Sequence, residues 1–159
     1  MTIRKIVSGG QTGVDRAALD AAKALGLERG GWCPKDRRAE DGRIPDDYSL
    51  QETSTADYAE RTELNVRDSD GTLILTVGLP SGGTAYTIEC ARKLRRPYFL
   101  VDLAHDPDPS AAGRWLAEGQ ISVLNVAGPR QSQFAVGYAR AYRFLLALFP
   151  RKHPDDQPR

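Results

Sequence analysis

The sequence predicts an α/β fold, a single Rossmann-like doubly wound domain with a mostly parallel five-stranded sheet. Apolar runs typical of buried strands alternate along the chain with segments whose apolar residues recur at helical spacing. Two of the predicted strands are followed by glycine-rich turns, as in folds where each strand leads into a helix. The 159 residues suffice for one domain, placed at residues 1–150, and residues 151–159 are predicted to form a flexible polar tail.

The first strand, turn and helix are predicted within residues 3–25. Ile3, Ile6 and Val7 form a short apolar run, which a glycine-rich turn then ends. After the turn, small apolar residues recur at helical spacing from Val14 onward, and Gly26 signals the end of that helix. A second short strand is predicted at residues 30–33.

The later elements continue the alternation. Residues 34–55 have too little apolar periodicity for a regular element, so we predict a long polar loop that carries function; the alternative is a solvated connection without a function of its own. A helix is predicted at 56–67, and its polar face is either exposed to solvent or a wall of the site; that face contains Tyr58, Arg61 or Thr62, and Asn65. Further strands are predicted at 72–77, 97–101 and 121–126, and further helices after residue 84, at 110–118 and from about 131 to 149.

Composition and charge exclude several classes of function. Lys and Arg number 22 against 21 for Asp and Glu, so no excess of positive charge favours a nucleic acid polymer or an anionic membrane. Cys33 and Cys90 are distant in sequence from His105 and His153, which favours neither a disulfide framework nor a zinc site. Nowhere do about 18 apolar residues follow one another. We therefore expect a soluble cytoplasmic protein.

The first glycine turn predicts a phosphate site. Gly9, Gly10 and Gly13, with Gln11 and Thr12 between them, separate the strand from the helix. The free N–H groups of a helix's first turn, and the positive end of its dipole, then lie just beyond the end of a strand. The spacing matches neither GxGxxG nor a Walker A loop. The alternative is a plain turn whose glycines serve tight packing.

The second glycine turn repeats this arrangement after the predicted strand at 72–77. Ser81, Gly82, Gly83 and Thr84 are its small residues. We predict that this turn too binds an anion, and the alternative is a plain loop. In open α/β sheets, ligands bind outside the carboxyl ends of the strands, so both turns are expected to face one crevice.

Basic side chains are predicted at the same edge of the sheet. Lys35, Arg37 and Arg38 follow the second predicted strand, and Arg130 follows the last. Arg130 either reaches a phosphate or is exposed. Because lysine and arginine bind phosphate groups, these residues and the two turns predict a small molecule that bears a phosphate, with a heterocycle as its remainder.

Five segments together resemble the molybdenum-cofactor carrier family. They are SGGQTGVDRAALD, GGWCPKDRRAEDG, YAERTELNVRDSDGTLIL, SGGTAYT and LNVAGPR, and they span about residues 7–130. This family is a branch of the Rossmann-like domains that include the lysine-decarboxylase-like phosphoribohydrolases. The resemblance implies binding and carriage of the molybdenum cofactor (molybdopterin), a pterin whose side chain ends in a phosphate. It also implies a homo-oligomer, dimer or tetramer, and molybdoenzymes as receiving partners.

The resemblance also implies binding residues at the matching positions. These are Gly9, Gly10, Thr12, Gly13, Arg37, Arg38, Ser81, Gly82, Gly83 and Thr84. Asp36 departs from the pattern, since glycine is expected at that loop position.

The wider group supplies a rival prediction, a nucleotide-processing enzyme. Its phosphoribohydrolases carry a PGGxGTxxE motif whose glutamate acts on the ribose, and Thr87 stands at the position of that glutamate. Glu89 is two residues further on, roughly 200° around the helix, and should point away from the crevice. We therefore predict no catalytic residue and no catalytic metal, with Asp15, Asp68 and Asp70 as candidate substitutes. A third prediction is a nucleotide-sensing module.

Overall fold

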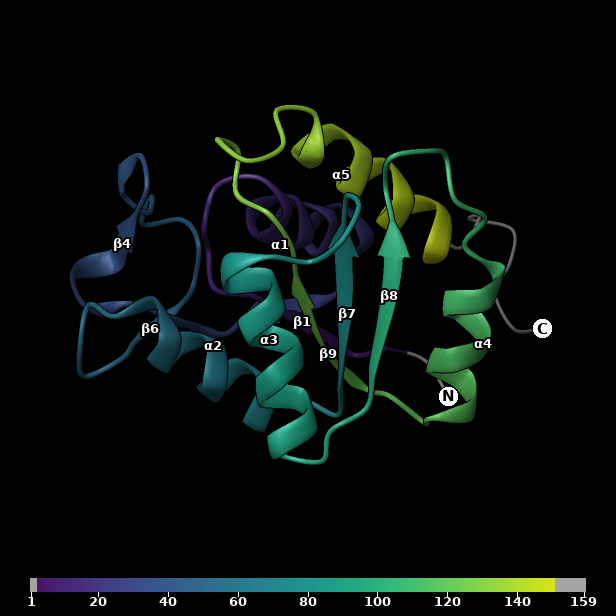
Figure 1. The fold of residues 1–159 in the computed structure, drawn as a ribbon, viewed down its shortest axis with the longest axis horizontal. Coiled ribbons are helices and arrows are strands. Elements are labelled where there is room, and N and C mark those ends of the chain that lie inside the picture. Colours follow the sequence, from purple (N-terminus) through teal and green to yellow (C-terminus); the bar gives the residue numbers. More distant parts are fainter. Residues whose placement is uncertain (1–2, 151–159) are drawn as a thin grey trace.

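The computed structural model describes residues 3–150 and is built around a five-stranded sheet (Figure 1). The strand order is β2-β1-β9-β7-β8, and every pairing in this sheet is parallel. The strands are β1 (Lys5–Val7), β2 (Glu28–Gly30), β7 (Gly71–Thr76), β8 (Tyr98–Asp102) and β9 (Val123–Ala127). The predicted α/β class with a five-stranded parallel sheet is confirmed.

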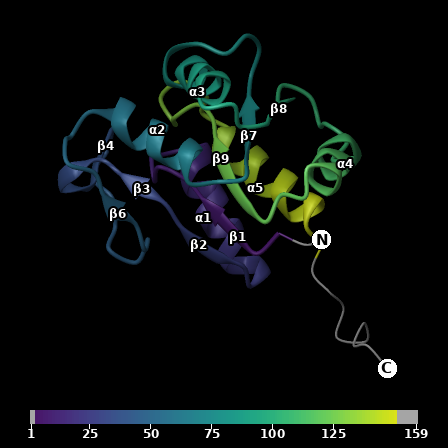
Figure 2. The same cartoon turned by 90° about the horizontal axis from the view of Figure 1, so that it is seen from below.

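Helices cover both faces of the sheet. Helices α1 (Val14–Leu25) and α5 (Gly137–Leu148) pack together on one face, and α2 (Tyr58–Arg67) and α3 (Gly82–Lys93) pack together on the other (Figures 1 and 2). Helix α4 (Ser110–Glu118) packs beside β8 and against α5. None of the helices within residues 3–150 is long and apolar enough to cross a membrane.

The main core lies between the sheet and the helices that cover it. Leu73, Ile74 and Leu75 in β7 are fully buried, as expected for a parallel strand covered on both faces. Ala17 and Ala21 of α1 are also fully buried. Their small side chains let α1 approach the sheet closely, which brings the turn before α1 to the carboxyl edge of the strands.

The structure differs from the sequence prediction at the second strand. Strand β2 begins at Glu28, two residues before the predicted start, and ends at Gly30. Gly31 has φ of +123°, a conformation that favours glycine, and it turns the chain away from the sheet. The predicted Trp32–Cys33 is a separate strand, β3, which pairs with β6 (Gln51–Glu52) in a small second sheet.

The polar passage at 34–55 is more ordered than the predicted loop. It contains a 3₁₀ turn, η1 (Lys35–Arg37), and an antiparallel hairpin of β4 (Arg38–Ala39) and β5 (Gly42–Arg43). A small core of its own holds it together, and this core contains Cys33, Ala39 and Ile44, with Tyr48 and Leu50 packed against them. Helical periodicity cannot reveal such a core, because its apolar residues are irregularly spaced.

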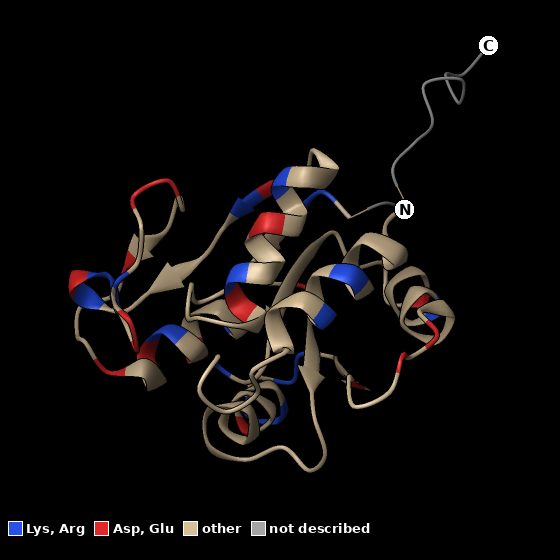
Figure 3. Ribbon diagram, turned by 90° about the horizontal axis from the view of Figure 1, so that it is seen from above, with Lys and Arg blue, Asp and Glu red and all other residues tan. Residues whose placement is uncertain are grey.

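The last helix also begins later than predicted. Turns occupy residues 131–136, and α5 runs from Gly137 to Leu148. The predicted polar tail at 151–159 lies outside the described residues. Figure 3 shows basic and acidic residues intermixed along the ribbon, in keeping with the near balance of 22 and 21 in the sequence.

Gly128, just after β9, permits a close approach between three elements. A Cβ atom there would lie 2.2 Å from the Leu75 carbonyl oxygen and 2.8 Å from the methyl carbons of Val14. Gly128→Ala is therefore expected to reduce the free energy of unfolding by about 2–3 kcal/mol, measured by urea denaturation. Gly113→Ala is the matched control, since its Cβ would lie 3.9 Å from the nearest atom, in Leu148. Equal stability of the two variants would contradict the close packing at Gly128.

Candidate functional site

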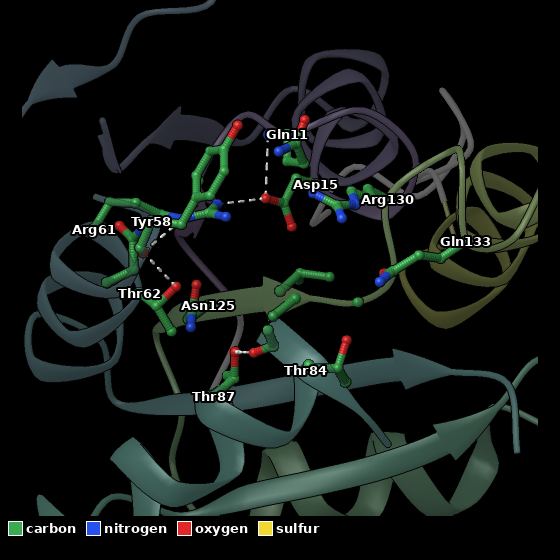
Figure 4. Close-up of a pocket in the computed structure, with 17 residues that line it drawn as sticks. Gln11, Asp15, Tyr58, Arg61, Thr62, Thr84, Thr87, Asn125, Arg130 and Gln133 are labelled. Carbon is green, nitrogen blue, oxygen red and sulfur yellow. Dashed lines mark hydrogen bonds and ion pairs between the residues drawn. The ribbon is translucent and has the colours of Figure 1, made fainter. Parts of the chain in front are cut away.

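A cavity of about 270 Å³ lies at the carboxyl end of β9 (Figure 4). Its walls come from five segments: the first glycine turn with the start of α1, the inner face of α2, the first turns of α3, the carboxyl end of β9, and the loop between β9 and α5. Figure 4 shows Tyr58, Arg61 and Thr62 on one side, Thr84 and Thr87 on the α3 side, and Gln133 on the side of the β9–α5 loop. The position is the one at which parallel α/β sheets bind ligands.

The N-terminus of α3 opens onto this cavity. Gly82, Gly83, Thr84 and Thr87 all line it. Within residues 3–150, the backbone N–H groups of Gly82 and Gly83 donate to no protein acceptor. These two donors lie at the positive end of the helix dipole, an arrangement that binds anions. Ser81 precedes the helix as its N-cap residue but does not line the cavity.

The first glycine turn also reaches the cavity, but most of its amides have partners. Gly9 and Gln11 line the cavity, as does Asp15 of α1. The Gln11 N–H donates to Asp15 Oδ2 at 3.2 Å, and the Thr12 N–H donates to Gln11 Oε1 at 3.0 Å. The two turns therefore face one cavity; in the first turn side chains accept from the Gln11 and Thr12 amides, whereas within residues 3–150 no side chain accepts from the Gly82 and Gly83 amides of the second turn.

The glycines of the first turn serve close packing. A Cβ on Gly9 would lie 1.7 Å from Arg61 Nη1, and one on Gly13 would lie 2.7 Å from the Pro129 carbonyl oxygen. Gly10 and Gly13 also have φ of +75° and +81°, which side chains rarely adopt. Neither Gly10, Thr12 nor Gly13 lines the cavity.

An ion pair between Asp15 and Arg61 lies beside the cavity. The Arg61 Nη1 atom is 3.0 Å from Asp15 Oδ2, and the two side chains are 14% and 7% exposed. Burial raises the pKa of Asp15, although the charge and hydrogen bond of Arg61 and the Gln11 amide oppose that rise. Arg61 also lies over the ring of Tyr58, 5.4 Å from its centroid.

The polar face of α2 forms a wall of the cavity. Tyr58, Arg61, Thr62 and Asn65 all line it, which decides between the two alternatives left open by the sequence. Both ends of the Asn65 amide are engaged, because its Oδ1 accepts from the Trp32 N–H at 2.8 Å and its Nδ2 donates to the Trp32 carbonyl at 2.9 Å. Asn65 thus fixes β3 against α2.

Three of the predicted basic residues lie away from the cavity. Arg37 is buried and donates to the backbone carbonyls of residues 44, 45 and 48 at 3.0, 2.7 and 2.7 Å. Arg38 donates to a backbone carbonyl and lies 4.5 Å from the ring centroid of Tyr58. Lys35 is exposed. Arg37 and Arg38 stabilise the polar passage in this structure.

Arg130, by contrast, lines the cavity together with Gln133. Its Nε atom is buried and has no hydrogen-bond partner within the described residues, although Glu40 Oε2 lies 3.4 Å away. Asn125 of β9 is 3% exposed, lines the cavity and donates to Thr72 Oγ1 at 3.2 Å. Sequence analysis missed Asn125 and Gln133; the one available signal was a polar residue within the apolar strand at 121–126.

Among residues 3–150, Asp15 is the one carboxylate that lines the cavity. Asp68 pairs with Arg67 at 2.7 Å, and Asp70 accepts from the Ser122 and Val123 amides at the amino end of β9. Glu89 lines a separate small hollow. No group of three or more His, Cys, Asp or Glu residues in the described part of the chain is arranged to hold a metal ion.

Comparison with known proteins gives two matches across nearly the whole chain. The sequence model of the circularly permutated YpsA SLOG family matches residues 6–149. A crystal structure at 1.45 Å resolution, described as a "Putative molybdenum carrier protein" from Syntrophus aciditrophicus SB, is 45% identical and superimposes with a TM-score of 0.87. The match covers 93% of this chain and 95% of that one. No curated protein matches significantly.

Proposed function

Because this chain belongs to the circularly permutated YpsA SLOG family, we propose that its cavity binds and carries a phosphate-bearing small molecule, the molybdenum cofactor. The family resemblance inferred from the five sequence segments is confirmed by this membership and by the 45%-identical structure. The proposal rests on one observation: within residues 3–150, the Gly82 and Gly83 amides have no protein acceptor where α3 opens onto the cavity. Their geometry suits a terminal phosphate.

The remaining walls suit the heterocycle of molybdopterin. A pterin presents hydrogen-bond donors and acceptors along its edge and a flat aromatic face. Asn125, Gln133 and Thr62 supply polar groups to the cavity, and Tyr58 supplies an aromatic ring. The volume of about 270 Å³ lies just below the usual range for small-molecule sites, about 300–1,000 Å³. The metal is part of the cargo in this proposal, which requires no protein ligand to it.

Thr87, at the position of the catalytic glutamate of the phosphoribohydrolases, favours binding without catalysis. The Thr87 hydroxyl donates to the Gly83 carbonyl at 2.9 Å, and it cannot replace the carboxylate that stabilises positive charge at a sugar carbon. We further propose, as the family resemblance implies, that the protein acts as a homo-oligomer and passes the cofactor to molybdoenzymes.

Equilibrium binding of molybdopterin tests the proposal. We expect binding in the micromolar range or tighter, with the ligand recovered chemically unchanged, and we expect mass spectrometry to find a phosphate-bearing pterin copurifying with the protein. Release of free base from nucleoside monophosphates at enzyme-like turnover, or no measurable binding of molybdopterin, would reject the carrier function.

A nucleotide-processing enzyme is the second candidate, and Asp15 is the observation that favours it. Burial raises the pKa of this carboxyl, and perturbed carboxyls at cavities often act as general acids or bases. Its carboxylate nevertheless accepts from both Arg61 and Gln11, at 3.0 and 3.2 Å. Any base release by the wild-type protein should then be lost in Asp15→Asn, and activity that survives this substitution excludes Asp15 as the catalyst.

A further inference from the structure

The tip of the β4–β5 hairpin places a carboxylate among donors of the β9–α5 loop. Glu40 Oε1 accepts from the Ser132 N–H at 3.1 Å, and Oε2 accepts from the Ser132 hydroxyl at 2.6 Å. The Thr12 hydroxyl also donates to Glu40, and Arg130 Nε lies 3.4 Å from Oε2. We refer to Thr12, Arg130 and Ser132 as the donor cluster.

The donor cluster has the composition of an anion site. It combines a backbone amide and two hydroxyls, which donate to one carboxylate, with a guanidinium whose Nε lies 3.4 Å from that carboxylate. Thr12 Oγ1 accepts from the Gln131 N–H at 3.1 Å, so its own proton is directed at Glu40. Burial alone would raise the pKa of Glu40, but the hydrogen bonds from Ser132 and Thr12 and the charge of Arg130 lower it.

The donor cluster borders the cavity already described. Arg130 lines the cavity and contributes its buried Nε atom, which lacks a hydrogen-bond partner in the described part of the chain. Gln11 also lines the cavity, and its Oε1 accepts from the Glu40 N–H at 2.9 Å. Thr12 and Ser132 do not line the cavity, so an anionic group of a molecule in the cavity would reach the donor cluster past Arg130, which belongs to both.

The hairpin does not depend on the Glu40 side chain for its position. Asp41 forms two hydrogen bonds with Arg16, at 2.6 and 2.8 Å, and the Glu40 backbone is held by Gln11. The Glu40 side chain is 18% exposed, so it has a route into solvent. Rotation of this one side chain can vacate the donor cluster while the hairpin remains in place.

We propose that the donor cluster is a second anion subsite, filled by the Glu40 carboxylate in the free protein and by an anionic group of the ligand in the complex. This inference is separate from the α3 site of the proposed function. The two sites together would bind a ligand with two anionic groups, one of them a phosphate and the other at the opposite end of the molecule.

Amide NMR during titration with inorganic phosphate tests the subsite, because the Ser132 amide reports on the donor cluster and the Gly83 amide on α3. In Glu40→Ala we expect the phosphate affinity measured at the Ser132 amide to be about tenfold higher than in the wild type. This factor corresponds to a wild-type site that the Glu40 carboxylate fills about nine-tenths of the time. Glu40→Gln removes the charge but keeps the size of the side chain, and it should also raise the phosphate affinity. A higher affinity in both variants could then not be explained by a loosened hairpin. Asp36→Asn, which removes an exposed charge from the same passage, should stay within about twofold of the wild type.

The outcomes separate the two sites. A Ser132 signal that ignores phosphate in both Glu40 variants overturns the inference, and so does equal tightening in Asp36→Asn. If Gly83 responds and Ser132 does not, the inference fails while the α3 site stands. If Ser132 responds and Gly83 does not, the donor cluster is an anion site and the α3 phosphate site fails.

Discussion

A valine at position 83 is expected to weaken ligand binding about a hundredfold while leaving the fold intact. Gly83 lines the cavity, and a Cβ added to it would meet no heavy atom within 4 Å, so the new side chain extends into open space. Valine would occupy the volume in which a phosphate contacts the Gly82 and Gly83 amides. Loss of one or two hydrogen bonds to a charged group, about 2.7 kcal/mol in all, corresponds to about a hundredfold in the dissociation constant.

Calorimetric titration with molybdopterin measures this loss. Gly83→Ala should fall between the wild type and Gly83→Val, since its methyl group fills less of the same space. Thermal unfolding serves as the control for both variants, because valine is tolerated in a helix at least as well as glycine and the midpoint should not fall. Wild-type affinity in Gly83→Val would place the phosphate elsewhere.

Replacement of Arg61 by methionine is expected to lower the free energy of unfolding by about 3 kcal/mol. The substitution leaves the Asp15 carboxylate buried without its cation, and breaking one side of a buried pair is costly for that reason. Urea denaturation at neutral pH measures the change. Arg67→Met on the same helix is the control, because its pair with Asp68 is about half exposed and screened by solvent, so its loss should change the free energy of unfolding far less. Similar losses in both variants would contradict the assigned importance of the buried pair.

The cost of Arg61→Met should also depend on pH. The folded-state pKa of Asp15 lies above its ordinary value of 3.8, so Asp15 contributes stability below that value and loses it as pH rises through the folded-state pKa. Removal of Arg61 raises this pKa further, because Arg61 stabilises the charged form. The stability difference between wild type and variant is therefore smallest in acid and grows toward neutral pH. A difference that stays constant from acid to neutral pH would exclude Asp15 as its source.

The order of helices and strands along the chain could be predicted, because most of these elements carry local signals; the order of the strands within the sheet was not predicted. The apolar run of β7 predicts a buried strand, and the glycine turns predict the starts of α1 and α3. Gly26, with φ of +73°, ends α1. Glycine was expected at position 36, and the backbone there does adopt a conformation that favours glycine. Its φ is +64°, although the residue is an aspartate.

The site was harder to predict, because partners of polar groups are set by tertiary contacts. Sequence placed Arg37 and Arg130 alike at the ends of strands, but Arg37 lies among backbone carbonyls and Arg130 reaches the cavity. It also treated the two glycine turns alike, although Asp15 and the Gln11 side chain occupy amides of the first. Asn125 became visible only when β9 was seen to end at the cavity.

The position of β9 between β1 and β7 has a consequence for how the protein is made. While a ribosome is still producing the chain, the strand that joins the two halves of the sheet is the last of the five to emerge. Until residues 123–127 have left the exit tunnel, β1 and β7 each present an open edge, and unpaired edges of this kind invite aggregation. Nascent chains stalled before residue 123 should accordingly depend on chaperones, and chains stalled beyond α5 should not.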